Sequence, residues 1–192
     1  MSLTRRDFLQ STGVAAVTAA VGTGAAGTEP ACAATIAFPV IDCHTHFYDP
    51  RRPEGVPWPG RDSSLYRTVL PADLRKLPQH LPVTGTIVVE ASSWLRDNDW
   101  LLELGEHDPW IVGVVGNLNP ESEDFVQQVR RLSANRLFRG IRVSVQRVQG
   151  LLQQQRSRVL GVLAEHDLAL DVNGGPETPE LLSRLEIGRA HV

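Results

Sequence analysis

The sequence predicts an α/β fold, a (β/α)8 TIM barrel of which about the first five strands are present. Short β-branched segments alternate with segments of helical periodicity, which is typical of βαβ units and a parallel sheet. The first strand leads into His-Thr-His rather than a glycine-rich nucleotide loop, which favours a closed barrel over an open doubly wound sheet. With 192 residues, the chain is shorter than the roughly 250 of a typical complete barrel.

Composition narrows the classes of partner. The formal net charge is -3 and 21% of the residues are charged, so we expect no nucleic-acid partner and no anionic lipid surface. The composition is compatible with a small-molecule substrate. Cys32 and Cys43 are the two cysteines, and they imply no disulfide framework. We expect Cys43 to be buried against the helices behind its strand, as small apolar thiols usually are.

Residues 1–33 read as a twin-arginine-type signal peptide. Arg5 and Arg6 precede a weakly apolar run at 14–26, and Ala-Cys-Ala at 31–33 resembles a cleavage site. The run contains several glycines and falls short of the roughly 20 apolar residues of a membrane span. The sequence therefore predicts a periplasmic or secreted protein, with the twin-arginine export machinery as a partner and no stable membrane association after cleavage.

The first expected strand carries the candidate metal ligands. Side chains alternate along a strand, so Asp42, His44 and His46 share one face while Cys43 and Thr45 share the other. Two adjacent imidazoles suit a divalent cation. From these residues alone, a polar patch at the end of a strand is an equally good interpretation.

A long connection at 48–69 follows, and its many Pro and Gly residues exclude regular structure. Trp58 in this loop is a candidate wall of the substrate site, although it could equally pack the loop onto the barrel. Pro71 opens a short helix. A buried strand is expected at 85–90, and Glu90 at its end is interpreted as an inner-layer carboxylate hydrogen-bonded to barrel neighbours.

The remaining chain continues the alternation. Helices are expected at 94–105, 121–132 and 151–165, strands at 110–116, 138–145 and 168–172, and a further helix from about residue 178. His80, His107 and His166 precede strands, so they belong to the stability face of a barrel and are expected to have surface or capping roles. Asp171 lies within a strand and ranks below His44 and His46 as a site residue.

Five segments then resemble one known family, the amidohydrolase-related (amidohydrolase 2) proteins of the metal-dependent hydrolase superfamily. The likeness is to the branch of sugar-lactone and pyrone-dicarboxylate lactonases, and it covers residues 40–185. The segments that carry it are I-D-C-H-T-H-F-Y-D-P (41–50), V-P-W (56–58), I-V-G-V-V-G-N-L-N (111–119), L-F-R-G-I-R-V (137–143) and V-L-A-E-H-D-L-A-L-D-V (162–172).

The resemblance implies a (β/α)8 barrel with His44 and His46 as metal ligands from the first strand. It also implies a later histidine ligand and an aspartate after the eighth strand, which this sequence does not contain. Zinc or manganese would suit, although some related lactonases act without metal. Arg142 is the candidate to hold a substrate carboxylate or lactone oxygen, with a barrel-wall salt bridge as the alternative role.

The expected function is that of an exported metal-dependent hydrolase, which opens a lactone or similar C–O or C–N carbonyl bond with metal-activated water. The substrate would be a small lactone or carboxylated ring compound. A metal-dependent decarboxylase of the same family and a non-catalytic exported binding protein on the same scaffold are the alternatives.

The end of the sequence carries a separate expectation. Residues 34–185 are expected to form the N-terminal part of the barrel, and 186–192 are interpreted as a non-native tail, since the heptapeptide matches a translated sequencing adapter. We therefore expect this chain alone to be inactive.

Overall fold

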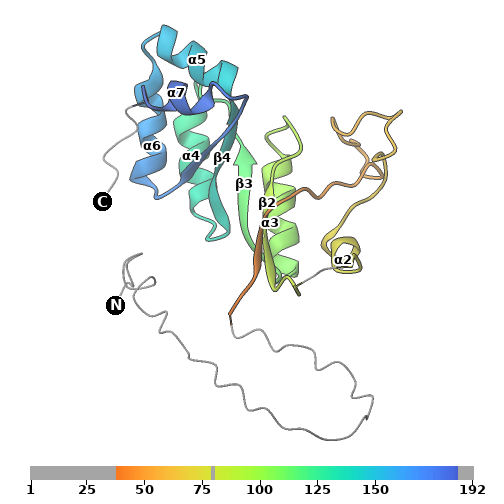
Figure 1. Ribbon diagram of the computed structural model, residues 1–192. Coiled ribbons are helices and arrows are strands. Elements are labelled where there is room, and N and C mark those ends of the chain that lie inside the picture. Colours follow the sequence, from red (N-terminus) through yellow and green to blue (C-terminus); the bar gives the residue numbers. More distant parts are fainter. Residues whose placement is uncertain (1–37, 79–80, 186–192) are drawn as a thin grey trace, which may run out of the picture. The chain divides into compact units, whose positions relative to one another are not determined.

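The computed structural model describes residues 38–78 and 81–185. The predicted signal peptide, His80 and the predicted tail lie outside the described residues. The strands are β1 (Ile41–Thr45), β2 (Gly85–Val89), β3 (Ile111–Asn117), β4 (Phe138–Ser144) and β5 (Ala169–Asn173) (Figure 1). The α-helices are α2 (Pro71–Leu74), α3 (Asp97–His107), α4 (Phe125–Ser133), α5 (Val145–Gln153), α6 (Gly161–Glu165) and α7 (Thr178–Leu182), and η1 (Ser157–Leu160) is a 3-10 helix.

The strands form one parallel sheet whose spatial order is the chain order, β1-β2-β3-β4-β5. This is the arrangement of half a (β/α)8 barrel, and it confirms the fold class predicted from the sequence. All carboxyl ends therefore meet at the same edge of the sheet. Among the described residues, no helix is long and apolar enough to cross a bilayer.

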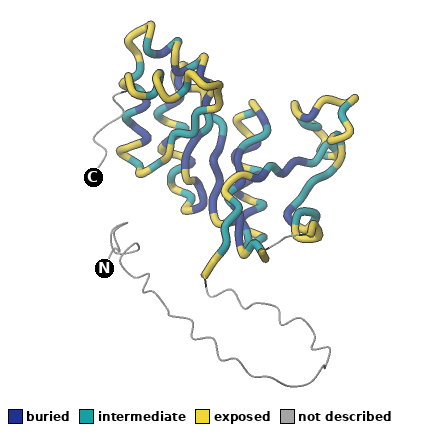
Figure 2. The backbone as a smooth tube through the Cα atoms, in the orientation of Figure 1, coloured by how far each residue is buried: buried dark blue, intermediate teal, exposed yellow. Residues whose placement is uncertain are grey.

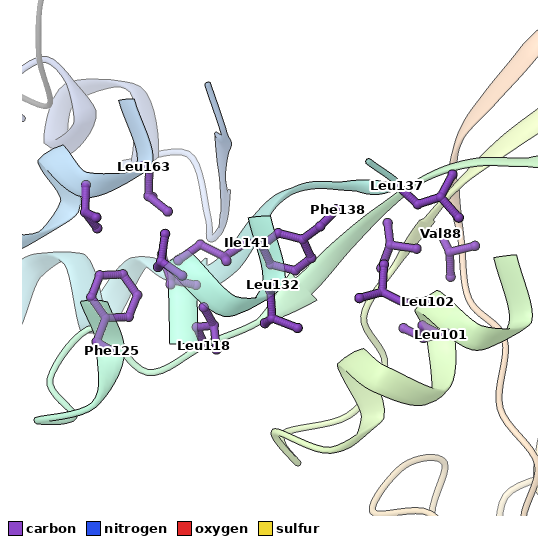
Figure 3. Packing of buried hydrophobic residues seen from close by; sticks show 14 of the residues in the cluster. Val88, Leu101, Leu102, Leu118, Phe125, Leu132, Leu137, Phe138, Ile141 and Leu163 are labelled. Carbon is purple, nitrogen blue, oxygen red and sulfur yellow. The ribbon is translucent and has the colours of Figure 1, made fainter. Parts of the chain in front are cut away.

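The hydrophobic core lies between the sheet and the helices that follow its strands. α3 packs on β3, α4 on β4 and α6 on β5. Ile141 and Val88 contribute fully buried strand side chains, while Leu132, Phe125 and Leu163 contribute the helical ones (Figure 3). Burial is greatest in the middle strands and lower in β5 (Figure 2). The core thus fixes the central strands firmly and leaves the outer ones less covered.

The helix expected at 151–165 is wrong. α5 begins at Val145, immediately after β4, because the hydroxyl of Ser144 accepts a hydrogen bond from the backbone N–H of Arg147 and caps the helix. α5 ends at Gln153, and Gln155 then adopts a positive φ of 56° that interrupts the helical path. The 3-10 turn η1 and the short α6 complete the connection.

Two further expectations need correction. The helix expected at 94–105 begins at Asp97 and ends at His107, and the residues before it form a turn in which the N–H of Trp94 donates to the hydroxyl of Ser92. Cys43 is exposed rather than buried. β1 lies at the edge of the sheet, and its register with β2 shifts between Asp42 and Thr45, so the strand around Cys43 is not covered as a central strand would be.

Candidate active site

Polar side chains from all five strands gather at the carboxyl edge of the sheet. His46 follows β1, Glu90 follows β2, Asn117 ends β3, Arg142 lies in β4 and Asn173 ends β5. They surround an open pocket of about 390 Å³, completed by Pro57, Trp58, Ala91, Ser92 and Ser93. A larger hollow of about 630 Å³ lies beside it over α3 and α4, but neither histidine lines it. The smaller pocket is therefore the candidate active site.

His44 and His46 lie side by side, as the alternation along the strand predicts. Their ring centroids are 5.0 Å apart and the rings are nearly perpendicular. Nδ1 of His46 lies 2.9 Å from the carbonyl oxygen of Val89. Because a carbonyl oxygen can only accept, Nδ1 carries the proton, and Nε2 of His46 keeps a free lone pair. The backbone of β2 thus fixes the tautomer that a metal ligand needs.

The pKa of His46 is lowered from its ordinary value of 6.5. Burial is the main cause, and the nearby charges of His44 and Arg142 act in the same direction, while the hydrogen bonds to the backbone of Val89 and Glu90 oppose them. Burial and positive neighbours therefore hold this imidazole neutral further into the acidic range than an exposed histidine.

Arg142 joins three strands. Its Nε donates to Oδ2 of Asp171 on β5 at 2.7 Å, and its Nη2 lies 3.1 Å from Nε2 of His44 on β1. A guanidinium can only donate, so Nε2 of His44 is the acceptor of this hydrogen bond. The salt bridge expected as one role of Arg142 is present. The same side chain lines the pocket, where a substrate oxygen could reach it.

Glu90 also lines the pocket. Its pKa is raised from 4.5, mainly by burial and further by the charge of Asp171, while the backbone N–H of Ser92 and the charge of Arg142 lower it. Glu90 was expected to be a carboxylate of the inner layer with hydrogen bonds to barrel neighbours. Among the described residues, its hydrogen bond is to the backbone of Ser92. The raised pKa makes the protonated form of Glu90 more accessible than that of an exposed glutamate.

The loop after β1 brings Trp58 over the pocket. The Trp58 ring lies 6.0 Å from that of His46 and 5.3 Å from that of Tyr48, and 41% of the residue is exposed. Both roles considered for Trp58 are thus compatible with its position, because it borders the pocket and packs on Tyr48.

Three contacts hold this loop in place. An antiparallel bridge between Tyr48 and Val69 joins its ends. Inside the loop, Arg52 pairs with the buried carboxylate of Asp97 at 3.1 Å and stacks over the Trp100 ring at 4.5 Å. The loop is therefore anchored to α3 as well as closed at its base.

The two histidines could supply two of the ligands of a metal ion. The Nε2 atom of an imidazole is a donor that zinc and manganese accept; that of His46 is free to bind, while that of His44 accepts a hydrogen bond from Arg142. Within 38–78 and 81–185, no group of three or more His, Cys, Asp or Glu side chains is placed to hold a metal. The described residues therefore supply two donors of a site and not a closed cage.

His107 and His166 have the roles expected of them, whereas two residues of the pocket were not predicted. His107 bonds the carbonyl of Glu103 at the end of α3, and His166 bonds the hydroxyl of Ser133, so both are structural. Sequence reasoning missed Asn117 and Asn173 as pocket residues. Their signal was available, since each stands at the carboxyl end of an expected strand.

A parallel sheet with the strand order of half a (β/α)8 barrel, and with polar residues at the carboxyl ends of its strands, defines the fold class of this protein. The chain belongs to the amidohydrolase family, whose sequence profile matches residues 41–188. The profile of the TAT (twin-arginine translocation) pathway signal sequence matches residues 2–22, so the chain carries a signal for export.

Known relatives share its sequence and fold over half their length. The chain is 28% identical over 148 residues to an L-fucono-1,5-lactonase of Burkholderia ambifaria, which covers 74% of this chain and 51% of that protein. The chain therefore spans about half the length of the curated relative that it matches.

Solved structures agree on the fold. An amidohydrolase from Burkholderia multivorans, crystallised with bound HEPES and with bound zinc, gives TM-scores of 0.65 and 0.63 at 23% and 24% identity, over 78% of this chain and 55% of that one. A probable 2-pyrone-4,6-dicarboxylic acid hydrolase from Acinetobacter baumannii with citric acid bound gives a TM-score of 0.56 at 15% identity, over 77% and 55% of the two chains.

Proposed function

We propose that the protein is an exported hydrolase that opens a lactone or a similar C–O or C–N carbonyl bond. The observation that carries this proposal is the convergence of His44, His46 and Arg142 beside one pocket, with imidazole rings 5.0 Å apart and Arg142 within 3.1 Å of His44. The family and the lactonase relative support the choice of a carbonyl substrate.

His44 and His46 would hold a divalent ion, zinc or manganese, through their Nε2 atoms. When bound, such an ion polarises a carbonyl and lowers the pKa of water at the site. The contribution of the chain is to fix the tautomer of His46 through its hydrogen bond to Val89 and to favour the neutral form of His46 through burial. Zinc bound in the Burkholderia multivorans amidohydrolase supports the choice of metal.

Arg142 and Trp58 would bind the substrate. A guanidinium forms paired hydrogen bonds with a carboxylate or a lactone oxygen, and Asp171 fixes one edge of Arg142 so that the rest is oriented. Trp58 offers a flat apolar face against which a sugar or ring compound can stack. Together they favour a small ring that carries oxygen on one side.

The experiment compares the wild-type protein with a His44→Ala/His46→Ala double variant, both spanning the full length of the relatives. We expect the double variant to lose bound metal and to lose turnover of a panel of 1,5-sugar lactones by at least about a hundredfold, the order found when a positioned catalytic group is removed. Metal content is measured by elemental analysis and ring opening by proton release.

Arg139→Met serves as the control, because Arg139 is exposed on the same strand as Arg142 and does not line the pocket. Unchanged lactone hydrolysis by the double variant would contradict the proposal. Release of carbon dioxide from carboxylated ring compounds, without ring opening, would favour a decarboxylase instead.

A further inference from the structure

We propose that the guanidinium of Arg142 and a divalent metal ion compete for the same lone pair on His44, so that Arg142 sets the affinity of the site for metal. The inference rests on the proposed function for the identity of the ligands. It deepens that function, because it couples the metal to the substrate through one side chain.

The competition follows from the single lone pair of a neutral imidazole nitrogen. Nη2 of Arg142 lies 3.1 Å from Nε2 of His44, so this nitrogen is already accepting a hydrogen bond. A nitrogen that accepts this bond cannot donate the same pair to a metal ion. The metal must therefore displace Nη2 before His44 can bind it.

Charge adds to the competition. The guanidinium of Arg142 carries a positive charge, and a dication beside His44 would lie close to it. Asp171 limits the repulsion, because it pairs with Nε of Arg142 at 2.7 Å and holds this edge of the guanidinium on β5. Displacement therefore requires only that Nη2 swing away from His44 while the bond to Asp171 persists.

Displacement has a consequence for the substrate. Nη2 released from His44 gains a free donor beside the pocket, where a carboxylate can accept it. A bound carboxylate would in turn hold Nη2 away from His44 and favour the metal. Because binding free energies are reciprocal, metal and carboxylate each strengthen the binding of the other.

The test measures the affinity for Zn²⁺ alone in the chain and its variants, by competition with a chromophoric chelator. We expect Arg142→Met to bind Zn²⁺ about fivefold more tightly than the wild type, the change that corresponds to about 1 kcal/mol for one net hydrogen bond. Arg139→Met is the matched control and should leave the affinity unchanged.

A second pair of variants tests whether the higher affinity for Zn²⁺ comes from Asp171 instead of His44. In Arg142→Met, the carboxylate of Asp171 loses its partner and could itself bind the metal. The gain must therefore persist when Arg142→Met/Asp171→Asn is compared with Asp171→Asn. Equal affinities in that comparison would overturn the inference.

A measurement on the wild-type chain does not depend on whether the variants fold. Side-chain NMR of Arg142 should show that saturating Zn²⁺ shifts the Nη resonances while Nε–H remains bonded to Asp171. Unchanged Nη resonances at saturation would also overturn the competition. Failure of the proposed metal site would look different, because His44→Ala/His46→Ala would then bind Zn²⁺ as well as the wild type.

Discussion

The tautomer and the pKa of His46 are set by the residues around it. The carbonyl of Val89 fixes its tautomer, and burial lowers its pKa. Alternation along the first strand predicted that His44 and His46 would be neighbours, because that geometry is local. The contact between Arg142 and His44 spans 98 positions of sequence, so no local pattern could predict it. The same holds for the pairing of Arg142 with Asp171.

The lowered pKa of His46 predicts how stability depends on pH. The unfolded chain binds the proton more readily, so the contribution of His46 to the free energy of unfolding is complete above pH 6.5 and is lost as pH falls from there through the lowered pKa of the folded state. We expect His46→Gln to flatten this part of the profile, as measured by denaturant unfolding without metal between pH 4 and 8. An unchanged profile in the variant would contradict this assignment.

Strand β3 and helix α3 are locked together by one amide side chain. Asn98 is fully buried, and its Nδ2 donates to the carbonyls of Leu95 and Asn117 at 2.8 Å each. Its Oδ1 accepts from the N–H of Asn117, also at 2.8 Å. The elements themselves were predictable from β-branched runs and helical spacing. The start of α5 was not, because the side-chain cap from Ser144 decides it.

Asn98→Ala should therefore destabilise the protein by about 2–3 kcal/mol, because it removes the hydrogen bonds of a fully buried side chain, including the two that join α3 to Asn117 of β3. Thermal and urea unfolding measure the loss. Gln127→Ala on the exposed face of α4 is the control and should change stability by less than about 0.5 kcal/mol. A loss at Asn98 no larger than the control would show that water replaces its hydrogen bonds.

At the scale of the whole described unit, the sheet has two edges. β1 and β5 each pair with one neighbour, which leaves a row of backbone donors and acceptors along their outer sides. The sequence predicted a barrel that is only partly built, and the five-stranded order agrees with it. The unpaired backbone groups of an edge strand can form hydrogen bonds with a strand of another chain, so such edges favour association.

We expect the chain to self-associate as its concentration rises, through the edge strands. Ala169→Lys places a charge on the exposed outer strand β5 and should weaken the association, as charged edges do in natural sheets. Sedimentation velocity over a hundredfold range of concentration measures it. Gln149→Lys adds the same charge on the surface of α5 and should have no effect. Equal weakening by both variants would point to net charge instead.

The bridge between Tyr48 and Val69 has a consequence for how such a protein can change. It holds the two ends of the loop together through hydrogen bonds of 3.0 and 2.9 Å, so residues 49–68 leave and rejoin the barrel at one point. The segment that carries Trp58 is thus a single insertion whose two ends lie next to each other. Replacing residues 49–68 as one unit would change the wall that Trp58 forms at the pocket, while His46 stays hydrogen-bonded to the backbone of β2.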